Sequence, residues 1–209
     1  MRLLRPAAQQ TYEKLFGAVY VCLMANVLLT GSCLPVVVAL AVVADPVASW
    51  PFFVALSGCC APALAGVFGV FADGSSRVWR PFWTAYRRAF RASLTAWYGA
   101  ALVVVVLAVD ARAVPALLPL FVSTGVLVVT CALAVILVAA TRPVPPRGLV
   151  RSCLFLTARR WYLALLNAVV LATVVAVVLL QPVAGLLVAC APLLYVVFGN
   201  TRAVVARLP

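Results

Sequence analysis

The sequence predicts an all-α membrane protein, a polytopic bundle of six transmembrane helices in one domain covering residues 1–209. Hydrophobic residues make up 67% of the chain and charged residues only 10%, with a mean hydropathy of +1.20. A soluble chain is about 45–50% apolar and about 25% charged. The few charges are gathered in short clusters, and the apolar stretches between them are long enough to cross a bilayer. The bilayer is therefore the expected solvent.

Six apolar stretches approach or exceed the roughly 20 residues that a helix needs to cross a hydrocarbon core of about 30 Å. They cover residues 16–43, 51–72, 93–109, 115–140, 162–180 and 183–199. Pro35 predicts a kink or break in the first stretch, because proline removes a helical hydrogen bond. Only Gln181–Pro182 separates the last two, and proline favours the start of a new helix there. One helix across both would overshoot the bilayer, so we expect two spans.

Fifteen of the sixteen basic residues fall into four clusters. The clusters are Arg2/Arg5/Lys14, Arg77/Arg80/Arg87/Arg88/Arg91, Arg142/Arg147/Arg151/Arg159/Arg160 and Arg202/Arg207. Short loops rich in Lys and Arg stay on the cytoplasmic side of a membrane. The other loops, 44–50 and 110–114, contain Asp45, Asp110 and the isolated Arg112. We therefore expect both termini and both Arg-rich loops in the cytoplasm.

The preference for Arg over Lys, together with abundant Ala and Val, is typical of a high-GC bacterium and suggests the bacterial cytoplasmic membrane. The net charge is +12. In a soluble protein such a charge would suggest nucleic acid as a partner. Here the Arg residues flank apolar spans, so we expect anionic lipid headgroups as the counter-charge and no nucleic acid.

The first Arg-rich loop has the pattern of an amphipathic interfacial helix over residues 77–92. At about 100° per residue, five aromatic residues share one face and five Arg residues take the other. The aromatic residues are Trp79, Phe82, Trp83, Tyr86 and Phe90, and the basic residues are Arg77, Arg80, Arg87, Arg88 and Arg91. Such a helix is predicted to dock on anionic lipid or on a partner. The alternative is a charge cluster that only sets orientation.

The second Arg-rich loop resembles the first and predicts a second interfacial helix. Arg159 and Arg160 precede two aromatic residues, as Arg87 and Arg88 stand among aromatics in the first loop. They are the further candidates for docking. Leu154–Phe155 takes the place of Phe82–Trp83, which suggests that spans 2 and 3 repeat as spans 4 and 5 in parallel.

Inside the spans, Asn26 and Asn167 are the strongest polar groups. An Asn in hydrocarbon needs hydrogen-bond partners, so each is expected to bridge helices, with contact to a solute as the alternative. Ala61, Ala65 and Gly69 recur every four residues and predict close helix packing within the chain. Self-association into a homo-oligomer through this stripe is the alternative.

Nothing in the sequence predicts catalysis, a cofactor or a metal site. The chain has no His and four acidic residues, and its seven Cys residues form no C-x-x-C pair. A vicinal redox pair at Cys59–Cys60 is an alternative to simple apolar packing of these thiols. Nucleophilic catalysis needs an activating base or metal, and neither is available. We therefore expect no enzyme; a lipid-modifying activity would have to use Asp45 and Asp110.

The segment from Asn26 to Pro35, with its Leu-rich centre and Leu-Pro end, resembles the first-span signature of the bacterial YesL family of multi-span membrane proteins. Residues 61–65 (Ala-Pro-Ala-Leu-Ala) and the aromatic–basic loop from Phe82 to Phe90 are similar to that family too. Residues 36–39 (Val-Val-Val-Ala) depart from the family's Thr- and Gly-containing continuation. The likeness covers the first half of the chain well.

The resemblance implies a non-catalytic accessory component of a carbohydrate or solute uptake system, associated with ABC importer permease subunits. It supplies no catalytic or binding residues. The chain itself lacks the Glu-containing coupling loop of a permease. The alternative function is a small autonomous transporter or channel for a neutral solute, with a path near Asn26 and Asn167.

Overall fold

The structure is a computed structural model that describes residues 5–43, 45, 48–142, 148–181 and 185–206. Every regular element in these ranges is a helix. In chain order they are α1 (Arg5–Ser32), α2 (Leu34–Val42), α3 (Trp50–Ser57), α4 (Cys60–Asp73), α5 (Trp79–Ala113), η1 (Pro115–Leu117), α6 (Leu118–Thr141), α7 (Leu149–Arg159), α8 (Trp161–Leu180), η2 (Gly185–Ala189) and α10 (Cys190–Val205). Among the described residues, five helices are long and apolar enough to cross a membrane, or six if a bent pair counts as one span. The all-α fold is therefore confirmed, with helices of the length and hydropathy expected of membrane spans.

The first predicted span is broken, as Pro35 predicted. α1 ends at Ser32 and α2 begins at Leu34, with an angle of 63° between the two parts. Pro35 lies in the first turn of α2, where its missing N–H leaves no helical hydrogen bond unmade. The bent pair α1–α2 is the one that decides between five and six spans.

The separate interfacial helix predicted for residues 77–92 is not a separate element. α5 begins at Trp79 and continues without a break through the predicted third span to Ala113. No Gly or Pro interrupts the sequence where the loop was expected to end, and Pro81 lies in the first turn, which tolerates proline. A helix of 35 residues is about 52 Å long. It exceeds a bilayer core by several turns.

The second span is interrupted at Gly58–Cys59, between α3 and α4. The fourth and fifth spans agree with η1–α6 and with α8. The last apolar helix runs from Leu187 to Val205, six residues past the predicted end at 199. Thr201, in this added segment, is buried in a polar contact with α8. α8 ends at Leu180, before the predicted Gln181–Pro182 turn, of which residue 182 lies outside the described residues.

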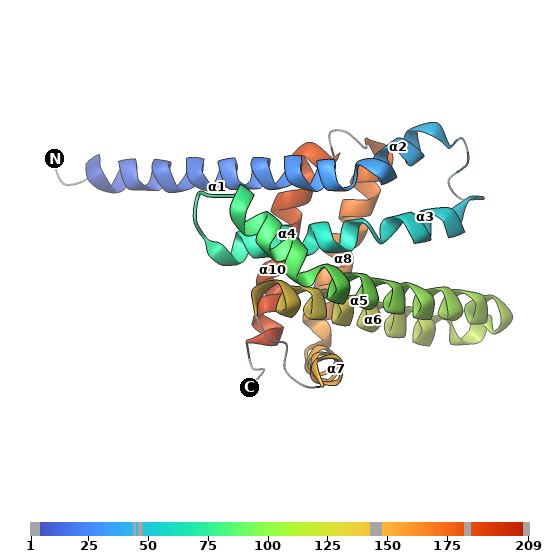
Figure 1. Cartoon of the computed structure of the whole chain (residues 1–209). Coiled ribbons are helices and arrows are strands. Elements are labelled where there is room, and N and C mark those ends of the chain that lie inside the picture. Colours follow the sequence, from blue (N-terminus) through green and yellow to red (C-terminus); the bar gives the residue numbers. More distant parts are fainter. Residues whose placement is uncertain (1–4, 44, 46–47, 143–147, 182–184, 207–209) are drawn as a thin grey trace.

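The helices do not all share one direction. In Figure 1, α1, α5 and α6 run along the long dimension of the molecule, while α8 and α10 run across it. α7 is seen nearly end-on, so it too lies across α5 and α6. The chain therefore does not form a simple up-and-down bundle of parallel helices.

The core surrounds α4 and the second half of α6. α4 has nine buried residues, including Phe68 and Phe71, and residues 130–140 of α6 are buried throughout. All the buried residues of α5 lie between Phe82 and Ser93, in its first half. α2 and α3 have none. Packing is therefore densest toward the end of the molecule where α4 meets α5.

Candidate functional site

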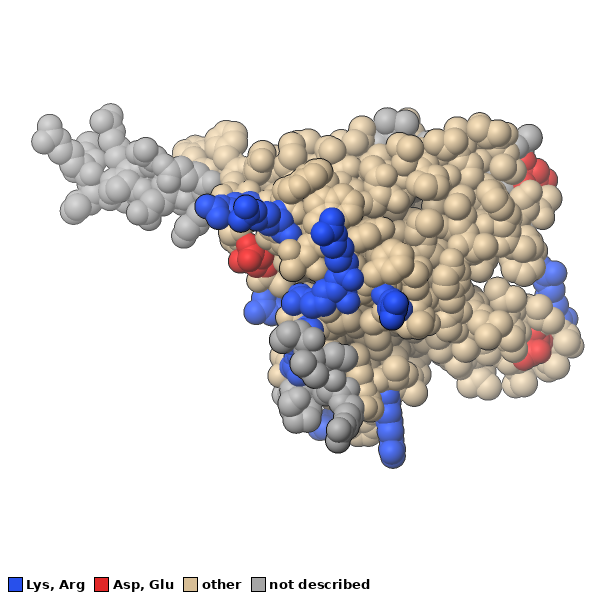
Figure 2. Space-filling view, in the orientation of Figure 1, with Lys and Arg blue, Asp and Glu red and all other residues tan. Residues whose placement is uncertain are grey.

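The two ends of the molecule differ in charge. Figure 2 shows most Lys and Arg side chains gathered at one end, where the α4–α5 turn lies in Figure 1. Asp45 lies between α2 and α3, and Asp110 and Arg112 lie near the end of α5, at the opposite end of the molecule. We refer to the first end as the basic end. The charge sorting predicted from the sequence therefore corresponds to two opposite ends of the fold.

The aromatic face of α5 packs against the bundle. Phe82 is fully buried, and Trp83 and Tyr86 are partly buried against the core. Their rings form a chain of contacts, with centroids 5.9 Å apart for Trp79–Trp83 and 5.2 Å for Trp83–Tyr86. Only Trp79 and Phe90 of the predicted docking aromatics are largely exposed. Most of this face therefore stabilises the fold and is not available to a lipid or partner.

The Arg face of α5 has the opposite character. Arg77, just before α5, and Arg80, Arg87 and Arg91 on it are exposed. We count Arg77 with this face. The guanidinium group of each forms no hydrogen bond or ion pair with another described residue. Arg88 differs, because its guanidinium donates a hydrogen bond to the carbonyl oxygen of Ala140 in the last turn of α6. A cation at a helix C-terminus interacts favourably with the carbonyls that lack helical partners. Arg88 thus fastens α5 to α6.

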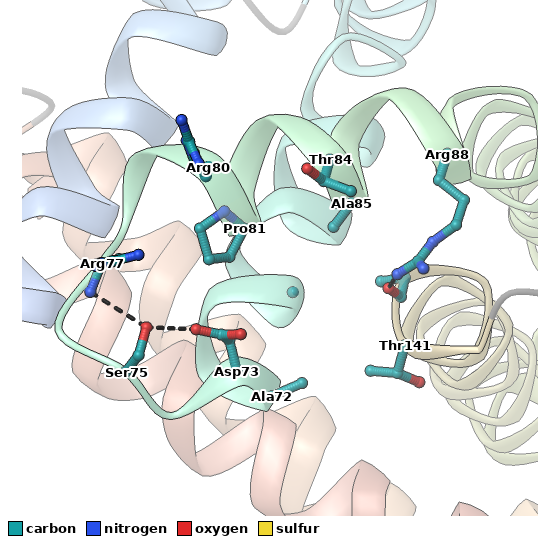
Figure 3. A pocket seen from close by; sticks show the side chains of 12 residues that line it. Ala72, Asp73, Ser75, Arg77, Arg80, Pro81, Thr84, Ala85, Arg88 and Thr141 are labelled. Carbon is teal, nitrogen blue, oxygen red and sulfur yellow. Dashed lines mark hydrogen bonds between the residues drawn. The ribbon is translucent and has the colours of Figure 1, made fainter.

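A pocket of about 650 Å³ lies beneath this Arg face, between the end of α4, the start of α5 and the end of α6. Arg77, Arg80, Arg88 and Asp73 are its charged lining residues, so three positive charges less one negative leave +2. Ser75 donates to the Asp73 carboxylate and accepts from the backbone N–H of Arg77. Figure 3 shows Arg88 reaching toward α6 and Arg80 pointing away from Asp73. The pocket has the charge to hold an anion.

The second Arg pair does not join this pocket. Arg160 lies at the break between α7 and α8 and donates to the carbonyl oxygen of Ala203 near the end of α10, at 2.9 Å. Arg160 therefore caps the C-terminal end of α10, as Arg88 caps that of α6. Arg159 remains exposed.

Asn26 joins α1 to the start of α10. Its amide nitrogen donates to the carbonyl of Leu187 at 2.9 Å, and its oxygen accepts from the N–H of Ala191 at 2.7 Å. These two backbone groups are four residues apart, at the point where the π-helical turn η2 passes into α10. Pro192 follows directly, and proline disturbs the helical bonding of the preceding turn. Asn26 is 1% exposed and satisfies both backbone groups, which makes it a helix bridge.

Asn167 is the second bridge, and it belongs to a polar group that the sequence did not predict. It donates to the hydroxyl of Thr201 at 3.3 Å and accepts from the amide of Asn200 at 3.1 Å. All three residues join α8 to α10. Asn200 and Thr201 are not predicted from the sequence as partners of Asn167, because they lie just beyond the predicted end of the last span at residue 199. Two polar residues directly after an apolar stretch were the available signal.

The small residues of α4 lie in the core. Ala61 and Ala65 are fully buried. A Cβ atom on Gly69 would overlap Cβ of Ala85 on α5, and one on Gly66 would come within 2.6 Å of the Phe82 ring. The stripe Ala61, Ala65 and Gly69 thus lies within the chain's own helix packing. Gly66, between two members of the stripe, lies against the Phe82 ring.

The described residues contain no group of three His, Cys, Asp or Glu side chains placed to hold a metal ion. Comparison with known proteins gives no match to any family model, to any curated protein or to any solved structure. The resemblance to the YesL family therefore stays a prediction, and the residues themselves are the basis for a functional proposal.

Proposed function

We propose that this chain is a non-catalytic accessory component of a bacterial solute-uptake system, embedded in the cytoplasmic membrane with both termini and the basic end in the cytoplasm. Its role in this proposal is to hold a partner or an anionic headgroup at the basic end. The partner class is the permease subunit of an ABC importer, as the likeness to YesL proteins implies.

The observation that supports a docking role is the unpaired Arg face of α5. Arg77, Arg80, Arg87 and Arg91 present four guanidinium groups that no described residue neutralises. Exposed charges of one sign attract a surface of opposite charge and speed its association. An acidic partner surface or an anionic headgroup provides the missing counter-charge.

The alternative of an autonomous transporter has less support. Both intramembrane Asn side chains, on which a solute path was postulated, are bonded within the chain: Asn26 to backbone groups and Asn167 to Thr201 and Asn200. A solute that used these amides would have to break helix bridges. Uptake of sugars by vesicles containing only the purified chain would favour the transporter and contradict the accessory role.

Purification of a tagged chain from its native host in gentle detergent tests the accessory role. We expect permease subunits of a solute importer to co-purify, and recovery to fall for the double variant Arg87→Gln/Arg91→Gln. Arg112→Gln, which removes a basic residue at the opposite end, is the matched control and should leave recovery unchanged. If the chain repeatedly purifies alone, or if both variants behave alike, the proposal fails.

A further inference from the structure

Two pockets adjoin at the basic end, and their linings differ in chemistry. The Arg-lined pocket described above shares Ser75 with a second pocket of about 430 Å³. The second pocket lies between α1, α4 and α10, and its walls include Val21, Val70, Phe71 and Tyr195. One turn, which connects α4 to α5, therefore separates a basic pocket from an apolar one.

The basic pocket offers unsatisfied donors to a phosphate. Arg77 and Arg80 line it and have no partner for their guanidinium groups among the described residues. Arg side chains bind phosphate oxygens through paired, charge-assisted hydrogen bonds. Arg80 points away from Asp73 in Figure 3, and as an exposed side chain it is free to turn toward a ligand. Asp73 opposes an anion, but its carboxylate already accepts a hydrogen bond from Ser75 and can accept one from a headgroup hydroxyl.

The apolar pocket offers space for hydrocarbon. Gly17 of α1 belongs to its lining, and a Cβ atom built there would meet nothing within 4 Å. Aliphatic and aromatic walls can pack against an acyl chain as bilayer hydrocarbon does, so a lipid held there keeps its chain out of water. A free phosphate ion has no apolar part that could fill such a pocket.

We propose that the paired pockets bind one anionic phospholipid, with its phosphate at Arg77 and Arg80 and an acyl chain between α1 and α4. A zwitterionic choline lipid fits less well, because its quaternary ammonium would stand among the Arg side chains. The inference rests on the membrane placement of the proposed function but not on the accessory role. If the unmodified chain shows no preference for the anionic lipid while importer subunits still co-purify, the lipid site is overturned and the accessory role is not.

Native mass spectrometry of the purified, delipidated full-length chain tests the lipid site. The probe is an equimolar mixture of phosphatidylglycerol and phosphatidylcholine with identical acyl chains. We expect a retained phosphatidylglycerol adduct, and a fall of about tenfold in its preference over phosphatidylcholine for Arg77→Gln/Arg80→Gln. Arg112→Gln is the matched control, since Arg112 is an exposed Arg on α5 that lines neither of the two pockets.

A second pair of variants tests the apolar half. Gly17→Leu should fill the second pocket and reduce retention of lipid, whereas Gly31→Leu should not. Gly31 is on the same helix, is equally open around its Cβ position and lines neither pocket. Leu is a better helix former than Gly, so both variants should keep α1 intact.

Equal retention of the two lipids by the unmodified chain would overturn the proposal, as would an unchanged preference in Arg77→Gln/Arg80→Gln. Displacement of the lipid by inorganic phosphate alone, with Gly17→Leu behaving as Gly31→Leu, would assign the basic pocket to a free phosphate and also overturn it.

Discussion

The two Arg-rich segments have similar sequences but are fastened to the molecule in different ways. In the first, α5 continues unbroken from Trp79, and Phe82 and Ala85 press against glycines of α4. In the second, the chain breaks at Arg160 between α7 and α8. Polar contacts dominate there: Arg160 with Ala203, and Asn167 with Thr201. Similar spacing of Arg and aromatic residues therefore does not imply a common packing partner.

This difference contradicts the parallel repeat that the sequence suggested. Phe82 is fully buried, but Phe155, near the corresponding place in the second segment, is 65% exposed. α4 presents Gly66 and Gly69 to α5, whereas no such glycine on α6 meets α7. Without such a glycine to receive it, the Phe155 ring stays outside.

Truncation of the paired aromatic residues should produce the largest contrast. Phe82→Ala should lower the free energy of unfolding by about 3 kcal/mol, because it leaves a cavity against α4. Phe155→Ala, which truncates the exposed aromatic residue of the corresponding pair, should change it by less than about 0.5 kcal/mol. Unfolding of the purified chain in mixed micelles provides the measurement. Equal losses of stability in the two variants would support the parallel repeat of the two segments.

Filling the close contact of α4 with α5 should cost slightly less. Gly69→Val places side-chain atoms against Cβ of Ala85 and 3.3 Å from the backbone oxygen of Pro81. We expect a loss of about 1–3 kcal/mol from overpacking. Gly99→Val on α5 is the control, since nothing lies within 4 Å of its Cβ position. A Gly69→Val protein as stable as Gly99→Val would show that the two helices separate easily.

Removal of the polar contact in the second segment should have a smaller effect. Asn167→Leu leaves Thr201 and Asn200 without their partner and should destabilise the chain by about 0.6–1.7 kcal/mol, the range for hydrogen bonds between membrane helices. Thr173→Val on the same helix is the control, because Thr173 is exposed and bonds only to the carbonyl of Val169. Thermal unfolding of both variants gives the comparison, and an unchanged midpoint for Asn167→Leu would contradict the bridge.

Removal of either capping Arg residue should have the smallest effect on stability. Capping of a helix C-terminus by Arg is the one feature that both segments share. Arg88→Gln should speed hydrogen exchange in the last turn of α6, and Arg160→Gln in the last turn of α10. Each is expected to cost about 0.3–1 kcal/mol. Arg159→Gln is the control, because the exposed Arg159 guanidinium forms no hydrogen bond or ion pair with a described residue. Exchange that rises equally in all three variants would rule out specific capping.

Much of the fold was predictable, because the physical rules involved act locally along the chain. Apolar length and the basic clusters predict helices long enough to cross a membrane, and Pro35 predicts the break between α1 and α2. Helix periodicity also placed five aromatic residues on one face of residues 79–90. It could not say whether that face meets lipid or protein, since both are apolar surroundings.

The sequence by itself determined the class of protein, the apolar spans and the four basic clusters, because hydropathy and charge are properties of the chain alone. Only the tertiary structure decided which polar groups are already satisfied. It bonds Asn26 to Leu187 and Ala191, and it joins Asn167 to residues beyond the predicted end of the last span. It also leaves Arg77 and Arg80 unpaired beside an apolar pocket. Partners that distant in sequence are selected by helix packing, which no local pattern encodes.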